Sequence, residues 1–186
     1  GLDGGDEEIS LRTQRTDAEI MATLIYFLVF CQALGALSGA VMAVCAELAY
    51  ARAMRDGRID RAEREHLNAI AHGLRWGMSL LLLSSFALVV VMYLLNAANQ
   101  PALTASYWIL IVFSGVIIYV SWALSRKRIS FALGSAVIFT GWWLLVFLTF
   151  GQLPALTFGA GIALYVVGVA ILYGIFHWAR LLLTSK

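Results

Sequence analysis

Charged side chains are scarce in this sequence. Of its 186 residues, 13 are Lys or Arg and 11 are Asp or Glu, so 13% are charged, whereas 61% are hydrophobic. An average soluble domain carries about 25% charged residues. This composition excludes a disordered chain, a nucleic-acid-binding domain and a typical water-soluble enzyme, and it indicates a multi-pass membrane protein.

Proline and cysteine are also rare. The two prolines, Pro101 and Pro154, fall in short breaks between apolar stretches, and each predicts a turn. Cys31 and Cys45 lie on one apolar stretch, too far apart along a helix to pair with each other, which excludes a disulfide framework. The sequence also lacks a nucleophile elbow, a P-loop and a paired-cysteine motif, so no catalytic residue is predicted.

Long apolar stretches dominate what remains. A helix needs about 20 apolar residues to cross the hydrocarbon core, and backbone polar groups must be paired inside it. Five segments qualify, at about residues 20–48, 74–96, 104–125, 129–150 and 155–179. The sequence therefore predicts an all-α integral membrane bundle with five transmembrane helices, in one domain over 20–186. An acidic polar tail without an apolar signal segment precedes it at 1–19.

Lys and Arg alternate between successive connections. Six arginines lie between residues 52 and 75, three basic residues lie at 126–128, and the segments 97–103 and 151–155 carry none. Because basic residues favour the cytoplasmic side, this pattern predicts a cytoplasmic connection at 52–73, a cytoplasmic C-terminus and an N-terminus outside.

The basic connections predict contact with membrane lipids rather than nucleic acid. Anionic headgroups on the cytoplasmic leaflet attract such residues. The residues assigned to them are Arg52, Arg55, Arg58, Arg61, Arg126, Lys127 and Arg128. Within the first connection, Asp56-Gly57 predicts a helix end, and Asp60 with Glu63 resembles a capping box that starts a new helix at Arg61.

Small residues recur at helical spacing in the first and fifth segments. Gly35, Gly39 and Ala43 are four apart, and Gly161 and Gly168 are seven apart. Such stripes allow helices to approach closely, either within the chain or at the seam of a homo-oligomer or larger membrane complex. We expect the first and fifth helices to pack against each other through them.

Glu47 is the only acidic residue inside a predicted span. An ionisable residue in a membrane helix is a functional candidate. Two interpretations stay open: a structural role near the cytoplasmic interface, or a proton or cation pathway through Glu47 and Gln32.

Histidine and tryptophan suggest a second alternative. His72 and His177 lie toward the predicted cytoplasmic side, where they could ligate haem or a metal. Trp142 and Trp143 place aromatic mass inside the fourth span, where they either pack in the core, face lipid or contact a quinone. A membrane redox protein is therefore the alternative to a chain with no cofactor.

Several segments resemble a known group of proteins. These are Ala53-Met54-Arg55-Asp56-Gly57-Arg58-Ile59, Trp76-Gly77, Gly141-Trp142-Trp143 and Leu153-Pro154. The chain resembles small, largely uncharacterised bacterial and archaeal multi-pass membrane proteins. The resemblance implies the fold and a prokaryotic inner membrane, and it implies no activity. Our leading expectation is a non-catalytic membrane subunit, binding module or transport-related component.

The orientation is testable with reporter fusions. A periplasmic reporter should be active at the N-terminus and after residue 100, and a cytoplasmic reporter after residue 127 and at the C-terminus, because basic residues stay in the cytoplasm. A cytoplasmic N-terminus would refute the orientation.

Overall fold

Five α-helices and one short 3-10 helix make up the part of the chain that the structure, a computed structural model, describes. It describes residues 4–56, 61–95, 100–153 and 156–184. The elements are α1 (Gly4–Asp56), α2 (Arg61–Leu94), the 3-10 helix η1 (Pro101–Leu103), α3 (Ala105–Ser125), α4 (Phe131–Thr149) and α5 (Phe158–Thr184). Each α-helix contains a stretch long and apolar enough to cross a membrane. The predicted all-α five-helix bundle is confirmed.

Helix boundaries follow from local side-chain chemistry. The predicted ends at Asp56 and Arg61 are where α1 ends and α2 begins, while the capping residue Asp60 lies outside the described residues. The Thr104 hydroxyl accepts a hydrogen bond from a backbone N–H in the first turn of α3, and the Ser130 hydroxyl does the same for α4. These side chains pair N–H groups that a helix start leaves without partners.

The ends of α3 and α4 share one geometry. Lys127 and Gly151 have φ values of 55° and 64°, in the left-handed region. After α3, the backbone N–H of Arg128 donates to the carbonyl of Ala123 at 3.0 Å, which closes the last turn. The predicted turn at Pro154 lies outside the described residues, directly after the closed end of α4.

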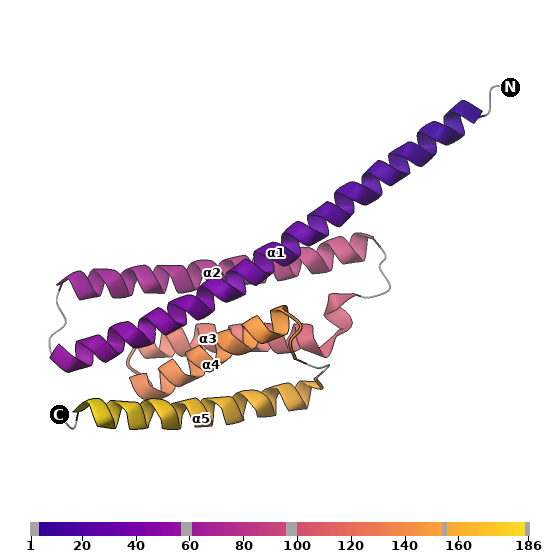
Figure 1. The fold of residues 1–186 in the computed structure, drawn as a ribbon. Helices are drawn as coiled ribbons and strands as arrows, with labels where there is room; N and C mark the ends of the chain where they lie inside the picture. The colour runs from indigo at the N-terminus through magenta and orange to yellow at the C-terminus, as the bar shows by residue number, and fades with distance from the viewer. Residues whose placement is uncertain (1–3, 57–60, 96–99, 154–155, 185–186) are drawn as a thin grey trace.

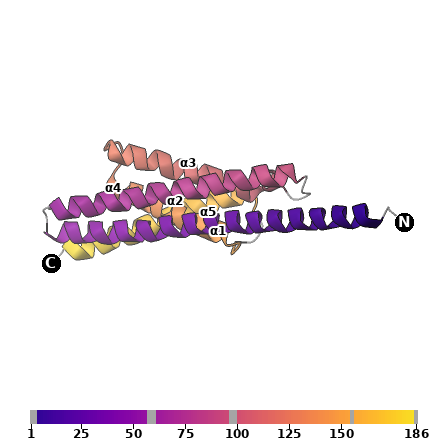
Figure 2. The same ribbon diagram turned by 90° about the horizontal axis from the view of Figure 1, so that it is seen from above.

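The long helix α1 runs antiparallel to α2 and extends beyond the bundle at its N-terminal end (Figures 1 and 2). Its 53 residues correspond to about 80 Å, against about 30 Å for a hydrocarbon core. The C-terminus lies at the opposite end, beside the end of α1 and the start of α2 (Figure 1). We call this the basic end, because Arg52 and Arg180 lie there on the last turns of α1 and α5.

Small residues on α1 make room for both of its main neighbours. A Cβ atom at Gly35 would lie 2.7 Å from the Leu81 backbone nitrogen and 2.9 Å from the Gly77 carbonyl oxygen, both on α2. A Cβ atom at Gly39 would overlap the ring of Trp142 on α4. Ala43 is 3% exposed on the same side of the helix. The stripe therefore seats α1 against α2 and α4.

The small residues of α5 face other helices. A Cβ atom at Gly161 would lie 2.6 Å from Ile109 on α3, and one at Gly168 would lie 2.9 Å from Thr140 on α4. Our expectation that the two stripes pack against each other is thus wrong. The reason is that α4 lies between the packing faces of α1 and α5, and its Trp142 occupies the space next to Gly39.

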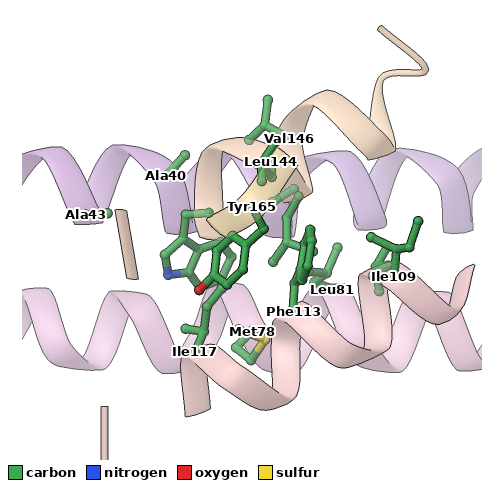
Figure 3. Packing of buried hydrophobic residues seen from close by; sticks show 14 residues of the cluster. Ala40, Ala43, Met78, Leu81, Ile109, Phe113, Ile117, Leu144, Val146 and Tyr165 are labelled. Carbon is green, nitrogen blue, oxygen red and sulfur yellow. The ribbon is translucent and has the colours of Figure 1, made fainter. Parts of the chain in front are cut away.

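The core is centred on α4, in which more than half of the most apolar stretch is buried. Trp142, Leu145 and Phe113 are almost fully buried there. Figure 3 shows Phe113 and Ile117 of α3 with Tyr165 of α5 facing Met78 and Leu81 of α2. Because acyl chains are as apolar as these side chains, close packing rather than water exclusion holds the helices together.

The Gly39 contact predicts a stability effect. Gly39→Ala should destabilise the bundle by about 1–3 kcal/mol, since the methyl group forces the buried Trp142 ring to move. Gly115→Ala on α3 is the matched control, because nothing lies within 4 Å of its Cβ position; it should be neutral or stabilising. Thermal unfolding in detergent, followed by circular dichroism, measures both. Equal stability of the two variants would contradict the packing described.

Candidate functional site

Glu47 forms an ion pair with Arg180, across from α1 to α5. Nη2 of Arg180 lies 3.1 Å from Oε2 of Glu47 and 3.0 Å from Oγ of Ser135 on α4. Both charged side chains are 17% exposed. The pair thus joins three helices at the basic end.

Aromatic rings surround the Arg180 guanidinium. It lies 4.9 Å from the Tyr50 ring centroid, 5.7 Å from that of Phe131 and 5.9 Å from that of Phe176. The rings of Tyr50 and Phe131 are themselves stacked, 3.8 Å apart. Cation–π attraction to these rings adds to the ion pair. The Glu47 carboxylate is therefore already engaged by a cation from its own chain.

Gln32 lies far from Glu47. Its Nε2 donates to Oγ of Ser85 on α2 at 2.9 Å, and Ser85 donates to the Leu81 carbonyl at 2.6 Å. Gln32 and Glu47 are 15 positions apart, which corresponds to about 22 Å along α1. The structure does not bring these two residues together. Gln32 bonds α1 to α2 and Glu47 bonds α1 to α5, at different positions along α1.

The two candidate haem or metal ligands lie on the surface. His72 and His177 are both exposed, and the His177 ring stacks on Tyr173 at a centroid distance of 6.2 Å. Within the described ranges, no group of three or more His, Cys, Asp and Glu side chains could hold a metal ion.

The proposed headgroup residues lie at or beyond helix ends. Arg52 is exposed on the last turns of α1, Arg55 and Arg61 belong to α1 and α2, and Arg58 lies outside the described residues. Arg126, Lys127 and Arg128 are exposed where α3 ends. The Arg126 and Arg128 guanidinium groups lie 4.9 and 5.0 Å from the centroid of the Trp122 ring. Two guanidinium groups thus lie close to the ring of Trp122, at the end of α3.

The two central tryptophans have different surroundings. Trp142 has no exposed surface and packs on α1, as described above. Trp143 is half-buried, in a row of rings with Phe139 and Phe147 along α4. The indole N–H groups of both have no hydrogen-bond partner among the described residues.

A cavity of about 410 Å³ lies between α2 and α3, with Trp142 as part of its wall. The helix α2 contributes Ala71, Leu74, Arg75 and Met78, and α3 contributes Ile117, Ile118, Ser121, Trp122 and Ser125. Of these side chains, Arg75, Ile118, Ser121, Trp122 and Ser125 are exposed, whereas Met78, Ile117 and Trp142 are buried. The cavity therefore leads from the outer surface of the bundle to its core.

Sequence reasoning found Trp142 but missed the cavity around it. One signal was present: Arg75 is a lone cation at the start of the second apolar segment, next to Trp76. The cavity depends on how α2 and α3 are placed relative to each other. The hydrophobic periodicity of either segment does not predict that placement.

The chain has no match in comparisons with known proteins: no family, curated protein or solved structure resembles it significantly. The function must therefore be argued from the residues themselves.

The ion pair predicts coupled stability effects. Glu47→Gln and Arg180→Met should each destabilise the bundle, and the double variant should lose less than the sum, with a coupling of about 0.5–3 kcal/mol. Unfolding in detergent measures the cycle, and Arg52→Gln, an exposed arginine of α1, is the control. Strict additivity of the two changes would show that the pair contributes no interaction energy.

Proposed function

We propose that this chain is a non-catalytic multi-pass membrane protein that binds an amphiphilic molecule of the bilayer in the cavity between α2 and α3. The observation that carries the proposal is the cavity itself. Its volume of about 410 Å³ falls in the range of ligand sites, and its walls are mainly apolar. The cavity extends from the outer surface of the helices to the buried Trp142, so a molecule of the bilayer can enter it laterally.

The arrangement of the helices supports the orientation in this proposal. The basic end contains Arg52 near the end of α1, Arg180 near the end of α5 and the 126–128 cluster after the end of α3. We assign this end to the cytoplasm and the projecting start of α1 to the outside, by the bias of basic residues. The cavity then opens into the cytoplasmic leaflet of a prokaryotic inner membrane.

The ion pair has a structural role in this proposal. Arg180 neutralises Glu47, and Gln32 is bonded to Ser85 at another depth. A proton or cation pathway through Glu47 and Gln32 has less support for that reason, because its two members are separated and engaged.

The outward faces of α1 and α5 remain apolar. On α1, Tyr26, Phe27 and Phe30 are each more than half exposed, and on α5 so are Val166 and Ile171. In this proposal they contact acyl chains or further subunits of a membrane complex, either as a homo-oligomer or with other chains.

Photolabelling tests the cavity. Diazirine-tailed phosphatidylglycerol and phosphatidylcholine are added separately to the full chain in detergent, and labelled residues are mapped by mass spectrometry. At least one probe should label Met78 and Ile117, which are only 6% and 3% exposed yet line the cavity. Ile109, which is 0% exposed and does not line the cavity, should stay unlabelled.

A filled cavity is the control. Ser121→Phe should remove the label at Met78, whereas Ser106→Phe, at an exposed position near the other end of α3, should leave it. Absence of label at both Met78 and Ile117 with both probes would overturn the proposed function.

A further inference from the structure

The cavity carries a specific set of polar groups, and they indicate what it binds. Resting on the proposed binding function, we infer that the occupant is an anionic phospholipid. Its phosphate is held by Arg75, an ester oxygen accepts a hydrogen bond from the Trp142 indole, and an acyl segment lies against Met78 and Ile117.

The first observation is the unpaired donor. Trp142 is fully buried, it lines the cavity, and its Nε1 has no hydrogen-bond partner in the described part of the chain. The atoms of its benzo ring face Gly39, so the opposite edge of the indole, which carries the N–H, faces away from α1. Buried indole N–H groups usually find an acceptor. The cavity is where a ligand can supply one.

The second observation is the depth of Arg75. A Cβ atom at Gly77 would lie 3.0 Å from the Gly39 backbone nitrogen, and Gly39 in turn faces the ring of Trp142. The indole of Trp142 therefore lies at the level of Gly77, only two residues from Arg75 on α2. A cation and a neutral donor thus line the same cavity at similar depth, inside the apolar stretch of α2 that begins at Ala69.

The third observation is the sign of the charge. Arg75 is the only charged residue among those that line the cavity, and the Arg126 and Arg128 guanidinium groups lie over Trp122 at its edge. No Asp or Glu follows Glu65 in the sequence, so α3, α4 and α5 carry no acid to neutralise them. Positive charge within an apolar span is costly without a partner, and an anion meets that need.

Shape selects a lipid among anions. The polar groups accompany apolar walls formed by Leu74, Met78 and Ile117, which a free phosphate would leave empty. An amphiphile with its charge at the exposed Arg75 and its chain toward the core matches both the polar groups and the apolar walls of the cavity. Arginine is well suited to the phosphate because it offers several N–H donors in one plane.

Native mass spectrometry of the delipidated full chain, titrated with phosphatidylglycerol or phosphatidylcholine, tests the inference. Phosphatidylglycerol should bind at least tenfold more tightly. Arg75→Gln should lower its affinity about tenfold, the usual effect of a lost charge-assisted hydrogen bond. The affinity for phosphatidylcholine should fall less, because the choline ammonium partly neutralises the phosphate that both lipids carry. Arg12→Gln, at an exposed arginine near the start of α1 that neither lines the cavity nor belongs to the proposed headgroup residues, is the matched control and should retain the preference.

Trp142→Phe tests the second contact. It keeps an aromatic ring against Gly39 and removes the N–H, so it should weaken both lipids by a similar, several-fold factor, because both carry ester oxygens. Inorganic phosphate should not compete with phosphatidylglycerol. Circular dichroism checks that each variant is folded.

Three results would overturn the inference: equal affinity of the unmodified chain for the two lipids, an equal loss of phosphatidylglycerol affinity in Arg12→Gln and Arg75→Gln, or displacement by inorganic phosphate. If the photolabel reaches Met78 while the lipid preference is absent, the proposed function stands and this inference fails. If neither occurs, both fail.

Discussion

The indole of Trp142 occupies the space that Gly39 leaves on α1, and the positions of the other helices follow from this contact. A side chain at residue 39 and the ring at residue 142 cannot both be accommodated. With the ring in place, α1 approaches α2 closely enough for Gly35 and Gly77 to meet backbone to backbone. The helix α3 then packs on the other side of α4, and its separation from α2 leaves the cavity.

Polar contacts fix the bundle at two depths. Gln32 and Ser85 join α1 to α2 in the half nearer the projecting N-terminus, and Glu47, Arg180 and Ser135 join α1, α4 and α5 at the basic end. Interhelical hydrogen bonds in membranes contribute only about 0.6 kcal/mol each on average. Their effect here is to set the register of helices that small residues have already brought into contact.

Much of the fold could be predicted from the sequence, because helix length and the end of α1 at Asp56 are local properties. The stripe at Gly35 and Gly39 also predicted that another helix packs closely on α1, but it did not predict which one. These glycines contact α2 and α4 rather than α5. Glu47 was recognisable as unusual, yet nothing near it in the sequence points to Arg180. The cavity could not be predicted because it depends on tertiary structure: Arg75 and Ser121 line the same cavity only once α2 and α3 are packed.

The ion pair also imposes an order on biosynthesis. Arg180 follows Glu47 by 133 positions, so the acid enters the membrane with α1 and its partner arrives later with α5. Until α5 is inserted, the Glu47 carboxylate lacks its Arg180 partner, and an isolated charge in hydrocarbon is costly. Insertion of α5 is thus the step that supplies the countercharge for Glu47. A product truncated before Arg180 therefore carries on α1 an acid without this countercharge.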